Sequence, residues 1–137
     1  MECEILLAKL ESLAKCVRRI EAQYVRDARE LEENLDKQEV IILNLQRAVQ
    51  ICVDIGNRVL LDFPTGTPAT MAETFKKMRE NDLITDETCE NLSKAVGFRN
   101  IAINQYEDAD CKIVFSIVKN HLCDFREFAK CVQKILG

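Results

Sequence analysis

Glycine and proline are scarce in this sequence, and tryptophan is absent. The 137 residues include 4 glycines and 2 prolines, so material for turns and loops is limited. Leu, Ile, Val, Ala, Glu, Lys and Arg dominate instead, and these residues favour helices over strands. The length fits one domain, residues 1–137, with a core of its own. We therefore expect a single all-α domain.

The chain also lacks the excess of basic residues that long nucleic-acid interfaces need. Its formal net charge is −4, whereas proteins that neutralise many phosphates are usually basic. RNA chemistry on this chain would therefore need a local cationic pocket or a surface pooled from two subunits.

Metal-site and disulfide patterns are missing, although the chain has seven cysteines. The count is odd and no Cys-x-x-Cys pair occurs, which matches neither zinc ligands nor a disulfide framework. We expect reduced structural cysteines, no metal, no cofactor and a cytoplasmic location. The sequence opens without a signal peptide, and no apolar run reaches the length of about 18 residues that a membrane span needs.

The apolar residues predict an antiparallel bundle of three long and two shorter helices. The first long helix is expected over residues 4–34, with a heptad seam of Leu6, Leu10, Leu13, Val17, Ile20 and Tyr24. Asp36 and Glu39 resemble a capping box that starts a second helix reaching about residue 63.

Breakers and caps delimit the remaining helices. After the loop at residues 63–68, Thr70 is expected to cap a short helix that ends near residue 81. Thr85 or Asp86 should begin the fourth helix, which Gly97 interrupts. Asp110 should cap the last helix, over about residues 111–136.

The segment from Arg99 to Tyr106 is the strongest candidate for function. It reads RNIAINQY, and its first and last residues are seven apart, close to two helical turns. An Arg-Asn pair on a core-facing helix is costly unless something uses it. Spacing alone equally allows Arg99 to bridge a nearby carboxylate and Tyr106 to pack.

These residues, with their flanks, resemble the HepT toxins of the HEPN superfamily, whose motif is Arg, four to six residues, His, one residue and Tyr. The similarity extends over most of the chain, including ILNLQRAVQICVDIGNRVL, ENDLITDETCENLSKAVGFRNIA and IVFSIVKNHLCDFREFAKCV. It implies a HEPN-like helical homodimer that cleaves RNA, either tRNA or mRNA, without a metal at a composite interface site. The partner implied is an MntA-like minimal nucleotidyltransferase antitoxin.

The resemblance assigns roles to four motif residues. Arg99 would bind the charged phosphate, and Asn100 would orient the Arg99 side chain or add a hydrogen bond. Tyr106 would accept AMP from the antitoxin, and the adduct would block the pocket. The motif histidine is expected at position 104, where this chain has Asn104. A carboxamide cannot take a proton from a ribose hydroxyl, so we expect this copy to be inactive or nearly so.

Two explanations for Asn104 stay open: a substitution introduced to silence a harmful enzyme, or a member that has lost its base and is kept for binding. The sole histidine, His121, either replaces the base or is a buried or interface residue on an apolar stripe. Asp54 and Arg47 share a helix face and could support the site.

Three functions therefore compete. The first is an RNA endonuclease toxin silenced by its partner. The second is a non-catalytic helical dimer that binds a nucleotidyltransferase and is modified by it. The third is a structural dimer without a site. The charged pair Lys76 and Lys77 is either a solvated face or a contact with RNA.

Overall fold

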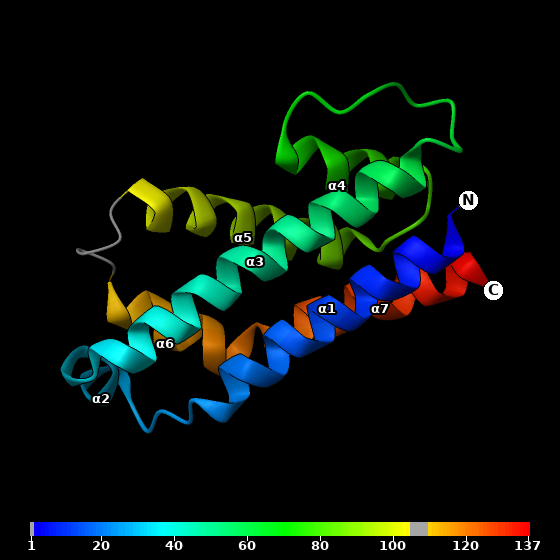
Figure 1. The fold of residues 1–137 in the computed structure, drawn as a ribbon. Helices are drawn as coiled ribbons and strands as arrows, with labels where there is room; N and C mark the ends of the chain where they lie inside the picture. Colours follow the sequence, from blue (N-terminus) through cyan, green and yellow to red (C-terminus); the bar gives the residue numbers. More distant parts are fainter. Residues whose placement is uncertain (1, 105–109) are drawn as a thin grey trace.

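Seven α-helices make up the part of the chain that the computed structural model describes, and no strand occurs there (Figure 1). The description covers residues 2–104 and 110–137, with the backbone alone for residues 100–104. The helices are α1 (Cys3–Ala22), α2 (Ala28–Glu33), α3 (Leu35–Leu60), α4 (Met71–Glu80), α5 (Asp86–Asn104), α6 (Cys111–Asn120) and α7 (Leu122–Leu136). The all-α prediction is confirmed, but the predicted count of three long and two shorter helices is wrong because two expected helices are each divided.

The helix expected over residues 4–34 is divided between α1 and α2. Asp27 is the reason: its carboxylate accepts a hydrogen bond from the Glu30 backbone N–H at 2.9 Å, which starts a new helix there. The heptad seam from Leu6 to Ile20 is buried as predicted. Tyr24 is not part of it, since it lies beyond α1 with 74% of its surface exposed.

Helix α3 begins earlier than the predicted Asp36–Glu39 capping box. Asn34 is the actual cap, and its side-chain oxygen accepts from the Lys37 N–H at 3.0 Å. The cap predicted at Thr70 is confirmed by the bond from the Glu73 N–H at 3.1 Å.

The last expected helix, residues 111–136, is divided at His121. Its predicted start is confirmed, because the Asp110 carboxylate accepts from the Lys112 N–H at 2.8 Å. His121 has φ −124° and ψ 3°, which ends α6 and changes the direction of the chain before α7. The apolar periodicity continues across this break because both helices pack against the same core.

Helix α3 occupies the centre of the bundle, with α1 and α7 on one side and α4 and α5 on the other (Figure 1). The rings of Phe75 on α4 and Phe128 on α7 pack edge to face in the core, with their centroids 6.0 Å apart. Gly56 lets α4 approach α3 closely, because a Cβ atom there would be 2.5 Å from Cγ2 of Thr74. The termini lie at the same end of the bundle.

All seven cysteines carry free thiols. Cys16, Cys52, Cys89 and Cys111 are buried and behave as small apolar residues, as the sequence predicted. Burial raises the pKa of the Cys52 thiol well above its ordinary value, so this sulfur stays protonated and unreactive. Within the described ranges, no helix combines the length and apolar character needed to cross a bilayer.

Candidate functional site

Arg99 lies near the C-terminal end of α5 and is partly buried against the start of α4. Its Nη1 is 3.8 Å from Sδ of Met71, a weak sulfur acceptor. Its Nε is buried and has no hydrogen-bond partner among the residues that the structure describes. Among the described residues no carboxylate pairs with Arg99, so the salt bridge that spacing alone allowed is not found there.

The state of Arg99 is energetically costly. A buried donor without an acceptor loses its hydration without compensation, typically about 1–3 kcal/mol and more for a charged group. A guanidinium presents its donors as a planar fork that suits the oxygens of a phosphate. Arg99 is therefore a cation in place for an anion from outside the described part of the chain.

The other motif residues are described less fully. Asn100 and Asn104 belong to α5, which ends at Asn104, and only their backbone is described. Asn104 follows Arg99 by five residues, or about 7.5 Å along a helix axis. Tyr106 lies outside the described residues. The roles predicted for Asn100, Asn104 and Tyr106 stay predictions.

Asp54 and Arg47 of α3 are on the side of that helix that faces α1. Asp54 accepts from Nε2 of Gln50 at 3.0 Å and pairs with Nζ of Lys9 on α1 at 3.9 Å. Burial raises the pKa of the Cys16 thiol on α1, and the positive charge of Arg47 partly opposes that rise. Within the described ranges, neither residue has a hydrogen bond or ion pair with Arg99, and their supporting role stays a prediction.

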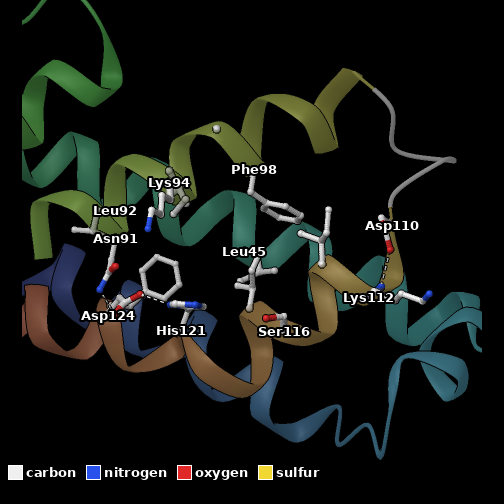
Figure 2. A pocket seen from close by; sticks show the side chains of 16 residues that line it. Leu45, Asn91, Leu92, Lys94, Phe98, Asp110, Lys112, Ser116, His121 and Asp124 are labelled. Carbon is white, nitrogen blue, oxygen red and sulfur yellow. Dashed lines mark hydrogen bonds and ion pairs between the residues drawn. The ribbon is translucent and has the colours of Figure 1, made fainter. Parts of the chain in front are cut away.

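A hydrogen-bonded network holds the opposite end of α5, and the sequence did not reveal it. Nδ2 of Asn91 donates to Oδ1 of Asp124 at 3.1 Å, and Nδ1 of His121 is 3.0 Å from Oδ2 of the same carboxylate (Figure 2). The side chain of Asp124 is 14% exposed. This network ties α5 to the start of α7. The spacing of His121 and Asp124 was a local signal, but Asn91 is 33 residues away from Asp124.

One alternative expected His121 to be buried, and the structure shows that it is not. It stands at the junction of α6 and α7, with 47% of its side chain exposed. Asn91, which shares Asp124 with it, precedes Asn104 by thirteen residues on α5. That separation is about 20 Å along a helix axis, so within one chain His121 is too far away to act as a base at position 104.

A groove of about 740 Å³ runs between α5 and the helices α6 and α7 (Figure 2). Leu45 of α3 lies at its floor, and Phe98 of α5 points into it. Its other apolar lining residues include Val49, Ile113, Ile117 and Phe125, and polar side chains border it as well. Gly97 also lines it, and nothing lies within 4 Å of where its Cβ would be.

Comparisons with known proteins agree with this geometry. A family model described as "Ribonuclease HepT-like" matches residues 13–132. The chain is 33% identical over 130 residues to the mRNA nuclease HepT of Shewanella oneidensis, covering 95% of this chain and 97% of that protein. It is 24% identical over 92 residues to the tRNA nuclease HepT of Aphanizomenon flos-aquae, covering 67% of this chain and 63% of that protein.

A solved structure shows the same fold at similar identity. It is the tri-AMPylated Shewanella oneidensis HEPN toxin in complex with MNT antitoxin, with a TM-score of 0.87 and 33% identity. The match covers 95% of this chain and 97% of that one. The helical arrangement described above is therefore that of a HEPN toxin.

Proposed function

This chain belongs to the HepT-like ribonuclease family, and we propose that it is the toxin of a HEPN/MNT toxin–antitoxin pair, acting on RNA in the cytoplasm without a metal. The observation that carries the proposal is Arg99, whose buried Nε has no partner in the described part of the chain. The relatives act on mRNA and on tRNA, so either RNA class suits this chain.

In the proposed reaction, a ribose 2′-hydroxyl attacks the adjacent phosphorus. The bond from the 2′-oxygen to phosphorus forms, and the bond from phosphorus to the 5′-oxygen of the next nucleotide breaks. The hydroxyl proton passes to a base, and the leaving oxygen takes a proton. Arg99 binds the phosphate oxygens, where negative charge grows, and Asn100 assists Arg99.

Position 104 is where the base belongs in this scheme. Histidine suits the role because its pKa is close to neutral. Asn104 keeps a hydrogen-bonding side chain but cannot accept the proton. We therefore propose that this copy binds RNA but hardly cleaves it. A general base typically contributes about 10² to 10⁴ in rate.

We also propose that two copies of the chain form the active unit. The apolar groove between α5 and α6 supports this, because an open apolar surface of this size gains from being covered. Its α5 wall includes Phe98, next to Arg99, so a second copy seated there would lie against the motif helix. The two motifs would then share a composite site.

The proposed silencing step is transfer of AMP to Tyr106 by a nucleotidyltransferase antitoxin. The phenol oxygen attacks the α-phosphorus of ATP, the new phosphodiester forms, pyrophosphate leaves and the phenol proton goes to solvent. The AMPylated relative bound to MNT antitoxin supports this step. Each adduct would add a negative charge beside a pocket meant for phosphate.

The test is to change Asn104→His and measure cleavage of tRNA and mRNA in vitro and growth arrest in cells. We expect cleavage to rise by about 10² to 10⁴ relative to the unchanged chain. The matched control is Asn104→Gln, which changes the side chain without supplying a base. A histidine variant that folds, yet neither cuts RNA nor stops growth, would contradict the nuclease proposal.

Asn104 itself favours a second candidate: a non-catalytic dimer that binds the nucleotidyltransferase and is modified by it. Incubation of the Asn104→His protein with that partner and ATP separates the two functions. A non-catalytic module would gain mass on Tyr106 but remain inert toward RNA, whereas the toxin would lose its restored cleavage as Tyr106 is modified.

A further inference from the structure

A second cleft, of about 570 Å³, lies between α4 and α5 on the side of α5 that faces α4. The cleft is lined on α4 by Thr70, Lys76, Lys77 and Arg79, and on α5 by Cys89 and Ser93. Glu73 and Glu80 also border it. It is a polar channel between two helices and is distinct in its lining from the apolar groove on the other side of α5.

One end of this cleft adjoins the residue that contacts Arg99, although neither Arg99 nor Met71 lines the cleft itself. Thr70, at one end of it, is the cap of α4, and the next residue is Met71, whose sulfur contacts the Arg99 guanidinium. Lys76 follows Met71 by five residues, or about 7.5 Å along the axis of α4. Five residues also turn by about 140° around the helix, so an extended anion bound at Arg99 would have to pass the cap at Thr70 to reach Lys76.

The cations of α4 differ in whether they are already engaged. Nζ of Lys77 is 3.6 Å from a Glu73 carboxylate oxygen and also donates to the Thr65 carbonyl. Arg79 pairs with Asp86 at 3.8 Å.

Lys76 is exposed and has no hydrogen bond or ion pair within the described ranges, although Glu80 is one helical turn away. An exposed lysine with no carboxylate partner keeps its full charge for a ligand. With Lys77 neutralised by Glu73, Lys76 is the cation of this cleft that a phosphate can use without breaking an existing pair.

We propose that the cleft between α4 and α5 carries the single-stranded RNA away from the cleavage site, with Lys76 binding a phosphate adjacent to the one held by Arg99. The inference rests on the proposed nuclease function and adds the path of the substrate. The hydroxyls of Thr70 and Ser93 line the same path and can bond to phosphate or ribose oxygens. An acidic protein would thereby bind RNA through Arg99 and one lysine that is unpaired in the described part of the chain, not through its overall charge.

The experiment uses the unchanged chain, whose Asn104 lets RNA bind without being consumed. A fluorescent single-stranded RNA of roughly 12 nucleotides is titrated at several salt concentrations. We expect Lys76→Ala to weaken binding by about three- to tenfold at low salt and to lower the slope of log affinity against log salt by about 0.7, the loss of one phosphate contact. Lys76→Glu should weaken binding further.

The matched control is Lys15→Glu. Lys15 is an exposed lysine of α1 with no ion pair among the described residues, and α1 packs against α3 and α7, away from the cleft. The control changes net charge as Lys76→Glu does, so equal weakening in both variants would overturn the inference. Because Lys76 is exposed, neither variant should alter the thermal melt.

Arg99→Ala separates failure of the inference from failure of the function. If Arg99→Ala weakens binding but both Lys76 variants leave affinity and salt slope unchanged, the path is wrong and the proposed site stands. If Arg99→Ala also has no effect, the proposed function fails together with the path.

Discussion

The polar side chains at the two ends of α5 differ in whether they have hydrogen-bond partners. At one end, Asn91 donates to Asp124, and that carboxylate also holds His121. At the other end, the partly buried Arg99 has a weak contact with the sulfur of Met71, and its Nε has no partner within the described ranges. The same helix is thus anchored by satisfied hydrogen bonds at one end and carries an unsatisfied cation at the other.

This contrast helps to distinguish polar side chains that stabilise the fold from polar side chains that bind a ligand. Buried polar groups in proteins are nearly always paired, so a paired group is explained by the fold alone. An unpaired one costs stability, and a ligand can supply the bond that offsets this cost. The Asn91 end is therefore explained by the bundle itself, and the Arg99 end is where we propose that an anion binds.

The largest effect is expected at the Arg99 end, measured as cleavage in the Asn104→His background. Arg99→Ala should lower the cleavage rate by about 10² to 10³, the typical loss of a donor to transition-state charge. Arg99→Lys should recover only part, because a lysine lacks the planar fork. Stability should not fall, since the variant removes a buried donor that had no acceptor. If Arg99→Ala instead lowers stability and the folded protein still cleaves at the unchanged rate, Arg99 serves the fold and not the reaction.

Substitutions at the Asn91 end should mainly change the stability of the protein. Asp124→Ala removes the hydrogen bonds to the part-buried Asn91 and the exposed His121, which we expect to lower the free energy of unfolding in urea by about 0.5–1.5 kcal/mol. RNA affinity should change much less than in Arg99→Ala. Gln133→Ala is the control, because Gln133 is exposed on the same helix and its side chain has no hydrogen bond within the described ranges. If Asp124→Ala melts like this control, the network does not anchor α5.

Gly97 lies between the two ends of α5, and its replacement tests whether a second copy covers the apolar groove. Nothing lies near its Cβ position, so Gly97→Ala should raise the stability of an isolated chain by about 0.5–1 kcal/mol through helix propensity. If a second copy approaches the helix there, the added methyl should instead weaken the dimer, measured by sedimentation over a range of concentrations. A dimer unaffected by Gly97→Ala places the second copy elsewhere.

The smallest effect is expected from Met71→Leu. The replacement keeps the volume and removes the sulfur acceptor, so stability should change by less than about 1.5 kcal/mol. RNA affinity should be kept or slightly raised, because Arg99 then has one contact fewer to give up. A marked loss of affinity would show that the sulfur positions Arg99 and does not merely tolerate it.

Local features of the fold were predictable where the signal was itself local. The caps at Thr70 and Asp110 and the apolar seam of α1 are confirmed. The errors came at Asp27 and His121, where the apolar pattern continues through a break in the backbone. Periodicity reports which faces are buried, but it does not report whether two segments on the same core are one helix.

The sequence by itself determined the helical class, the motif from Arg99 to Tyr106 and the asparagine at position 104, because each is carried by residue type and short-range spacing. Tertiary structure alone decided which polar groups are satisfied. Met71 is 28 residues from Arg99 and Asn91 is 33 from Asp124, so only packing brings those pairs together. Within the described residues, these contacts satisfy the polar groups at one end of α5 and leave Nε of Arg99 unpaired at the other, a difference that arises from three-dimensional packing.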